Sequence, residues 1–138
     1  MKNRMMYMAC VSLACLTLMG VAACRGTEGP KPEELAARTA KIYYDYLLEG
    51  KYEAFIDGFY QPDSIPPSYR SQMILSAKQY VDQMKQDHDG LNAVNIAHAR
   101  VDTAQHVGHA YLMLTFNDST HEEIVVPMVL HRNNWMMK

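Results

Sequence analysis

A chain of 138 residues with a formal net charge of −2 is long enough for one domain with its own hydrophobic core. The slightly acidic balance argues against nucleic-acid binding, because neutralising phosphates requires an excess of Lys and Arg on one face. The cysteines are Cys10, Cys15 and Cys24. Residues 25–138 therefore contain no thiol for catalysis, for a disulfide or for a Cys-type zinc site.

The first 23 residues have the pattern of a secretory signal peptide. Lys2 and Arg4 precede an apolar run from Met5 to Ala23, and small residues come immediately before Cys24. The run is also close to the roughly 20 residues that a membrane-spanning helix needs, so an uncleaved transmembrane anchor is the alternative. The small residues and the polar stretch that follows favour cleavage before Cys24.

The segment Val21-Ala22-Ala23-Cys24 resembles the lipobox of bacterial lipoproteins. The resemblance implies that the Cys24 thiol is diacylated, with palmitate-type chains, and that the new amino terminus is acylated after the leader is removed. Two or more chains anchor firmly, because each buried methylene contributes roughly 0.8 kcal/mol. Arg25 stands where an Asp is the usual inner-membrane retention signal. We therefore expect a lipid-anchored outer-membrane protein, and the absence of an acidic cluster after Cys24 favours a domain that faces the periplasm.

The residues after the anchor predict a tether followed by three helices. Residues 24–31 contain no large apolar side chain and a flexible tether is expected there. Apolar residues at helical spacing predict helices over 32–49, 51–59 and 67–89, with Gly50 and Gly90 as stop signals. Three prolines between the second and third helix predict a loop.

After Gly90 the chain is rich in β-branched and aromatic residues in short segments. These segments predict strands over 94–103, 108–117, 123–132 and 135–138. Asn133-Asn134 is predicted as the two-residue turn of the last hairpin. Pro127 cannot donate a hydrogen bond, so we expect it at a bulge or facing an edge. Helices followed by strands predict an α+β fold, with the N-terminal helices packed on one face of an antiparallel sheet of about four strands.

Three parts of the chain together resemble a known family of small bacterial lipoproteins. They are Pro32-Glu33-Glu34-Leu35-Ala36, Leu48-Glu49-Gly50-Lys51-Tyr52-Glu53-Ala54, and a four-strand tail that closes on Arg132-Asn133-Asn134-Trp135-Met136-Met137. This order resembles nuclear transport factor 2-like (cystatin-like cone) domains, many of which have no known function, and it covers residues 32–138. The resemblance implies a curved sheet, a cone-shaped domain and a pocket. In this superfamily the pocket hosts isomerases, dehydratases and polyketide cyclases, but also non-catalytic binders, and fold alone does not choose among them.

Some side chains could supply acid or base groups to such a pocket. An isomerase or cyclase needs a base and a phenol or acid in apolar surroundings. The candidates are Tyr43, Tyr46, Asp57, His98 and Tyr111. The tyrosines are equally suited to packing a helix on a sheet with their hydroxyls reaching water, so we name no catalytic residue.

We expect no metal and no cofactor. His106 and His109 are three residues apart, so they do not share one face of a regular strand. His88, between two aspartates at a helix end, is explained as a cation at the negative pole of the helix. The sequence has no Gly-rich phosphate loop and no nucleophile elbow.

Three triplets resemble the Asp-(Ser/Thr)-aliphatic or small acceptor used for O-glycosylation of exported proteins in some Gram-negative bacteria. Their hydroxyl residues are Ser64, Thr103 and Ser119. Chance and turn chemistry are the alternative explanation, because Asp and Ser favour turns.

The sequence as a whole predicts a lipid-anchored envelope protein that binds a small ligand or another envelope protein. The competing hypothesis is an isomerase- or cyclase-type enzyme. Clustering of Tyr43 or Tyr46 with Asp57 and one histidine in a single buried pocket would favour the enzyme.

Overall fold

The computed structural model describes residues 28–61 and 65–138. The predicted signal peptide, Cys24 and Ser64 lie outside the described residues. Three helices precede four strands: α1 (Pro32–Leu48), α2 (Tyr52–Asp57), α3 (Pro67–His88), β1 (Leu91–Asp102), β2 (Val107–Phe116), β3 (His121–His131) and β4 (Asn134–Met137). The predicted α+β class and the predicted order of elements are confirmed. None of the described helices has the length and the apolar character needed to cross a bilayer.

Local sequence explains where the long helices begin and end. Pro32 and Pro67 occupy the first helical position of α1 and α3, where the missing N–H of proline costs nothing. After α1 the chain reverses at Gly50, which has a φ of +73°. The left-handed residue that ends α3 is Asp89, with a φ of 62°, and Gly90 follows it with a φ of 101°.

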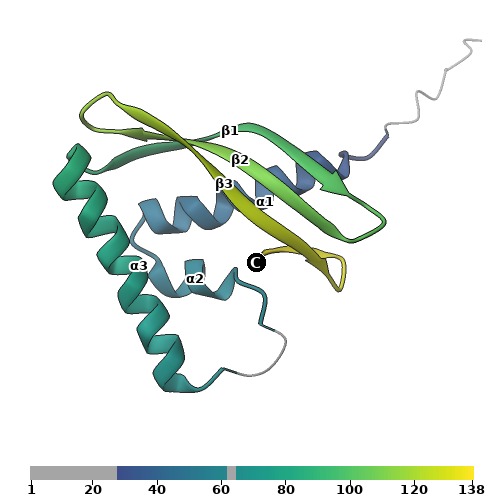
Figure 1. Ribbon diagram of the computed structural model, residues 1–138, viewed down its shortest axis with the longest axis horizontal. Coiled ribbons are helices and arrows are strands. Elements are labelled where there is room, and N and C mark those ends of the chain that lie inside the picture. Colours follow the sequence, from purple (N-terminus) through teal and green to yellow (C-terminus); the bar gives the residue numbers. More distant parts are fainter. Residues whose placement is uncertain (1–27, 62–64) are drawn as a thin grey trace, which may run out of the picture.

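The four strands form one antiparallel sheet in the order β1-β2-β3-β4 (Figure 1). Pro127 lies in unbroken register opposite His109 on β2, and its carbonyl accepts a hydrogen bond from the Lys138 N–H at 2.9 Å. In an antiparallel sheet, the backbone nitrogen and the carbonyl of one residue point towards the same neighbouring strand. The ring nitrogen of Pro127 therefore faces the side on which β4 ends, so no donor is missing from the β2–β3 ladder.

The last hairpin turns one residue earlier than predicted. Arg132 and Asn133 have φ values of 47° and 64°, and Asn134 already pairs with His131. The prediction of an Asn133-Asn134 turn is therefore wrong. The earlier turn sets Trp135 opposite Leu130 and leaves Trp135 only 6% exposed, so burial of this large ring accounts for the register.

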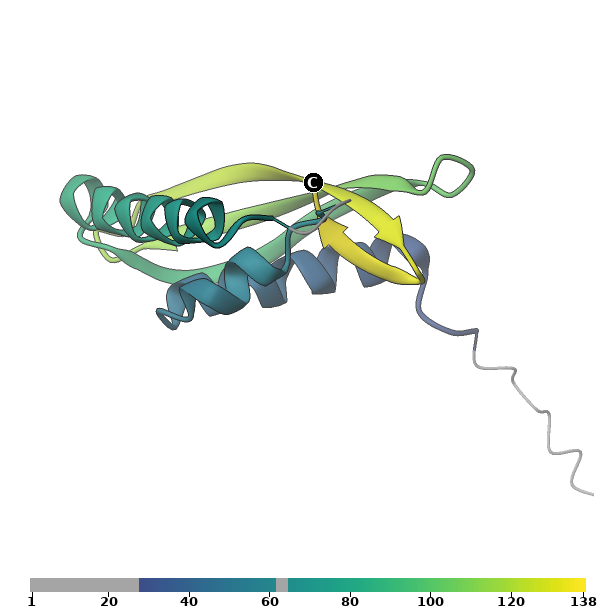
Figure 2. The same ribbon diagram turned by 90° about the horizontal axis from the view of Figure 1, so that it is seen from below.

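The core lies between the sheet and α1. Alternate β2 residues from Ala110 to Phe116 are buried, and they face the buried alanines and Leu47 of α1. Small alanine side chains let the helix backbone come close to the sheet. Figure 2 shows α1 and α2 on the same side of the sheet. The C-terminal end of α3 meets the β2–β3 turn, where the Asp118 N–H donates to the His88 carbonyl at 3.2 Å.

Candidate functional site

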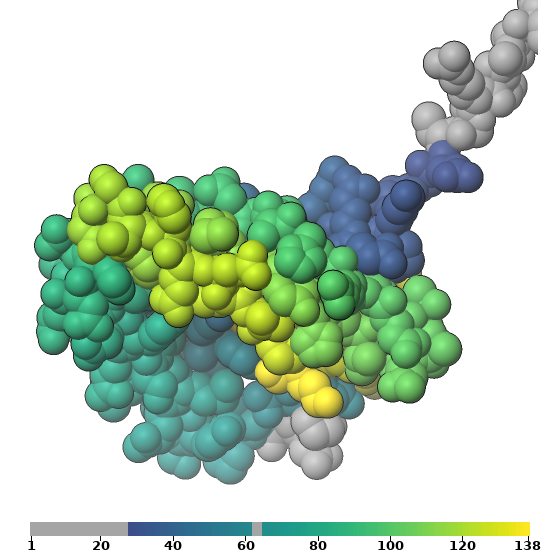
Figure 3. Space-filling view, turned by 45° about the horizontal axis from the view of Figure 1, so that its top comes forward, coloured from purple at the N-terminus to yellow at the C-terminus, as the bar shows by residue number. Residues whose placement is uncertain are grey.

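An apolar hollow of about 440 Å³ lies between α2 and α3, and we name it the α2–α3 groove. Its lining residues come from α2, the residues that follow it and α3: Phe55, Ile56, Phe59, Tyr69, Gln72, Met73, Ser76, Ala77 and Tyr80. In Figure 3 the surface is recessed between the yellow-green strand β3 and the teal helices. None of these lining side chains carries a formal charge at neutral pH.

The floor of the groove is a run of edge-on aromatic contacts. The ring centroids of Phe55 and Phe59 are 5.4 Å apart, and Tyr44 of α1 packs on Phe55 at the same distance. Edge-to-face pairs of this kind stabilise by about 0.5–1.5 kcal/mol beyond the burial of their surface. Across the groove, Ala77 is nearly buried, and its small side chain leaves room that a larger residue would fill. The groove is therefore a preformed apolar surface.

Two phenols near the groove are held in their neutral form. Burial raises the pKa of Tyr44 to about 12, and the nearby Tyr80 phenol adds to the shift. Burial, with a smaller contribution from Glu122, also raises the pKa of Tyr80. A phenol with a raised pKa stays protonated and serves as a hydrogen-bond donor, not as a base.

A second hollow of about 380 Å³ adjoins the groove and shares Ile56 and Phe59 with it. Asp57, Arg70 and His131 are among the residues that line it. Both guanidinium Nη atoms of Arg70 donate to the Asp57 carboxylate, the second at 3.4 Å. This carboxylate is paired with a guanidinium and largely exposed, so it does not have the apolar surroundings of the carboxylates that act as general bases.

The five candidate pocket residues are not brought together. Tyr43 packs its ring against Gly58 and donates its hydroxyl to the Trp135 carbonyl at 3.3 Å, so it joins α1 to the sheet and to the end of α2. Tyr46 lies beside Tyr43 with a centroid separation of 6.5 Å, and Lys51 Nζ stands 5.8 Å from the Tyr46 ring.

His98 and Tyr111 lie on the opposite side of the sheet from the helices. They are cross-strand partners, and their rings stack with centroids 4.0 Å apart. Of the candidates, only Asp57 reaches a hollow that also contains a histidine, His131. The apolar spacing of residues 51–59 and 67–89 predicted six of the groove residues as helix-packing residues: Phe55, Ile56, Phe59, Met73, Ala77 and Tyr80. Helical spacing alone does not show that these side chains line an open groove in the folded protein.

The predicted glycosylation residues that the structure describes lie in turns. Thr103 follows β1, and Ser119, with a φ of 69°, lies between β2 and β3; both are exposed. The aspartates before them accept backbone N–H groups, Asp102 from Gln105 at 3.0 Å and Asp118 from Thr120 at 2.9 Å. Turn chemistry therefore accounts for both aspartates, and the two hydroxyls remain accessible.

His88 has a more specific setting than a helix end. Its Nδ1 lies 3.0 Å from Asp118 Oδ2, and its ring stacks on Phe116 at 4.4 Å. This contact joins the end of α3 to the β2–β3 turn. Within residues 28–61 and 65–138, no group of three His, Cys, Asp or Glu side chains is arranged to hold a metal ion.

No protein-family model matches the sequence, and no curated protein matches it significantly. Among solved structures, a Campylobacter jejuni protein described as a candidate NTF2-like transpeptidase superposes with a TM-score of 0.59. The match covers 72% of this chain and 94% of that chain, at 10% sequence identity. At this identity the likeness concerns the fold and not the activity. The chain has the nuclear transport factor 2-like fold.

Proposed function

We propose that this protein is a lipid-anchored binding module of the cell envelope, without a catalytic role. Its α2–α3 groove would hold a small apolar ligand or an apolar segment of another envelope protein. The observation that carries the proposal is a preformed groove lined by aromatic and aliphatic side chains, with no charged residue among them.

The size and lining of the groove support binding. Ligand sites are typically concave, mostly apolar and about 300–1,000 Å³ in volume, and a few polar groups orient the ligand. The groove has an apolar floor with the polar side chains of Gln72 and Ser76 at its rim. Tyr69 and Tyr80, which are 53% and 41% exposed, offer aromatic contact area along the groove at little cost in side-chain entropy.

The titratable groups support binding over catalysis. Asp57, which lines the adjoining hollow, is paired with Arg70. In the described part of the chain, no polar or charged side chain is buried. An isomerase or cyclase would need a base in an apolar site, whereas the Asp57 side chain is largely exposed and paired with Arg70.

A substitution at the rim tests the groove. Ser76 is exposed and lines the groove, so Ser76→Trp should fill it without changing the core. Leu75, which is 50% exposed and does not line the groove, offers the matched control Leu75→Trp. The full acylated proteins would be purified from membranes and their co-purifying molecules identified by mass spectrometry. We expect a molecule that is lost with Ser76→Trp and kept with Leu75→Trp; equal recovery with both variants would contradict the proposal.

A substitution at the predicted lipidation site tests the anchor. The Cys24→Ser chain should accumulate as an uncleaved, unlipidated precursor that no longer partitions into detergent as the parent does. The parent should fractionate with outer membranes and resist protease in intact cells. Normal processing of Cys24→Ser would contradict lipidation at this residue, and rapid digestion in intact cells would contradict the periplasmic orientation.

A further inference from the structure

Helix α1 carries a second apolar stripe on its exposed surface. Its buried residues are three alanines and Leu47, whereas Leu35 and Ile42 are 41% and 49% exposed. Residues three, four or seven apart lie on one side of a helix. The two exposed side chains therefore share a side with the half-buried Thr39 and Tyr46. We name these four residues, which supply about one side chain per helical turn, the outer α1 stripe.

The charged side chains beside the outer α1 stripe neutralise one another. Arg38 donates to Glu34, and Lys41 Nζ donates to Asp45 Oδ2 at 2.6 Å. Both pairs join residues four apart on α1, so they form a strip of balanced charge next to the apolar one. Long Lys and Arg side chains keep their charged ends in water while their methylenes cover apolar surface. These pairs therefore do not prevent the stripe from entering an apolar boundary.

The C-terminal end of the outer α1 stripe combines an aromatic ring with a cation. Lys51 Nζ stands 5.8 Å from the centroid of the Tyr46 ring. Tyrosine is enriched where a membrane meets water, because its ring is apolar and its hydroxyl is polar. A lysine beside it reaches the headgroups of lipids. This end of the stripe therefore has the side chains of a membrane interface.

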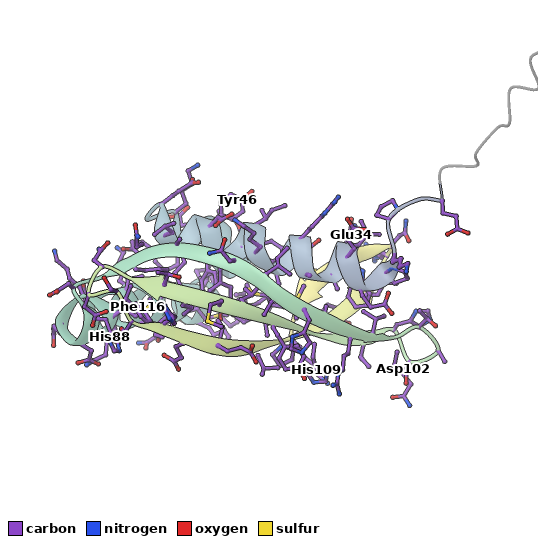
Figure 4. All side chains as sticks on the ribbon, turned by 90° about the horizontal axis from the view of Figure 1, so that it is seen from above. Glu34, Tyr46, His88, Asp102, His109 and Phe116 are labelled. Atoms are coloured by element: carbon purple, nitrogen blue, oxygen red, sulfur yellow. The ribbon has the colours of Figure 1, made fainter. Side chains whose placement is uncertain are left out.

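The other end of the stripe lies close, along the chain, to the proposed anchor. The step from Cys24 to Pro32 is eight residues, which span at most about 30 Å when fully extended. Residues 28–31, which precede α1, lead away from the domain on the helical side of the sheet (Figures 2 and 4). Figure 4 also shows Glu34 and Tyr46 on the side of α1 that points away from the sheet. The anchor therefore tethers the domain at the end of α1 where the stripe begins.

We infer that the outer α1 stripe lies against the surface of the bilayer that holds the lipid anchor. This inference rests on the proposed acylation of Cys24. A stripe this short does not hold a free domain on a membrane, but the anchor makes the contact intramolecular, with an effective concentration of roughly millimolar. The exposed Leu35 and Ile42 enter the boundary between headgroups and acyl chains, and the sheet faces away from the bilayer.

Lipid-borne quenchers test which face of the domain meets the bilayer. The acylated Ile42→Cys protein is purified from membranes, labelled with a fluorophore and reconstituted into phosphatidylethanolamine–phosphatidylglycerol vesicles that contain nitroxide-labelled lipid. Residues 25–138 contain no cysteine, so the label reports the introduced position. The matched control is Val125→Cys, because Val125 is 50% exposed and pairs with Tyr111 on the side of the sheet away from the helices. We expect quenching at residue 42 to be about threefold stronger than at residue 125; equal quenching overturns the inference.

A charge within the stripe separates its contribution from that of the anchor. Leu35 lies in the first turn of α1, where a carboxylate suits the helix. In the labelled Ile42→Cys background, Leu35→Glu should lower quenching to the level of residue 125 while the protein still floats with the vesicles. Leu75→Glu, at a 50% exposed position on α3, should leave the quenching unchanged. Circular dichroism of each variant checks the fold.

Flotation distinguishes failure of the stripe from failure of the anchor. A parent protein that does not float with vesicles contradicts acylation of Cys24 and, with it, the inference. A parent that floats, together with a label at residue 42 that is not quenched, keeps the anchor and overturns the contact of the stripe. Unchanged quenching after Leu35→Glu also overturns that contact.

Discussion

Gly58→Ala tests how closely α1 is packed against the end of α2. An ideal Cβ at Gly58 would lie 2.5 Å from Cδ1 of Tyr43 and 2.7 Å from two further ring atoms, which is closer than carbon atoms can approach. The backbone of Gly58, with a φ of −75° and a ψ of −12°, suits alanine well. Any loss of stability must therefore come from the contact with the ring and not from backbone strain.

The expected size follows from two opposing effects. At a compatible backbone, Gly→Ala stabilises by about 0.4–1 kcal/mol because the unfolded chain loses freedom. Overpacking a tight contact destabilises by about 1–3 kcal/mol. The net expectation for Gly58→Ala is a loss of about 1–2 kcal/mol in the free energy of unfolding, or roughly 5–10 °C in the melting temperature. The fluorescence of Trp135, the one tryptophan of the chain, reports unfolding in urea.

A double-mutant cycle identifies the cause. Tyr43→Ala removes the ring, so adding Gly58→Ala to it should cost nothing or stabilise slightly. Tyr43→Phe keeps the ring and removes only the hydroxyl that donates to the Trp135 carbonyl. Gly58→Ala should therefore cost as much in the Phe background as in the parent. An equal cost in all three backgrounds would refute the argument that Gly58 accommodates the Tyr43 ring.

Three further predictions concern stability and modification. Trp135→Ala should lower the free energy of unfolding by about 3–5 kcal/mol, because the residue is 6% exposed; unchanged denaturation with loss of a bound ligand would contradict this. Hydrogen bonds from Thr120 and then His88 hold the pKa of Asp118 below its usual 3.8. Its charge therefore stabilises the fold above about pH 4, and this contribution is lost as the pH falls through the lowered pKa. Asp118→Asn should flatten the acid limb of a stability–pH curve, and an unaltered limb would count against the assignment. If Thr103 and Ser119 carry glycans, their alanine variants should each lose one glycan mass in intact-protein mass spectrometry, whereas a parent of unmodified mass would exclude both.

The order and type of the elements could be predicted from the sequence because their causes are local. The helical period of apolar residues and the prolines at the first helical positions of α1 and α3 depend on neighbours a few residues away. The β-branched residues after Gly90 favour strands through preferences that likewise depend on nearby residues in the sequence. These signals identified the three helices and four strands of residues 28–61 and 65–138, with ends that differ from the predicted ends by at most three residues.

The groove and the last turn depended on contacts between distant segments. Burial of Trp135 against the sheet moved the turn to Arg132-Asn133, which a preference for Asn in turns could not reveal. Phe55 and Phe59 have the spacing of core residues. The α2–α3 groove that they line forms where α3 runs past α2 towards the β2–β3 turn (Figure 1). Such a path is set by helix packing and not by local propensity.

The side of the sheet occupied by each β1 residue was decided in the same way. An irregularity between Ile96 and His98 places Ile96 opposite Leu112, on the helical side, and His98 opposite Tyr111, on the face away from the helices. In a regular strand, residues two apart share a face, so the inserted residue reverses the alternation. The sequence determined that this segment is a strand. Only the pairing with β2 decided that His98 lies away from the helices, because a bulge is set by the register of two strands and not by either strand alone.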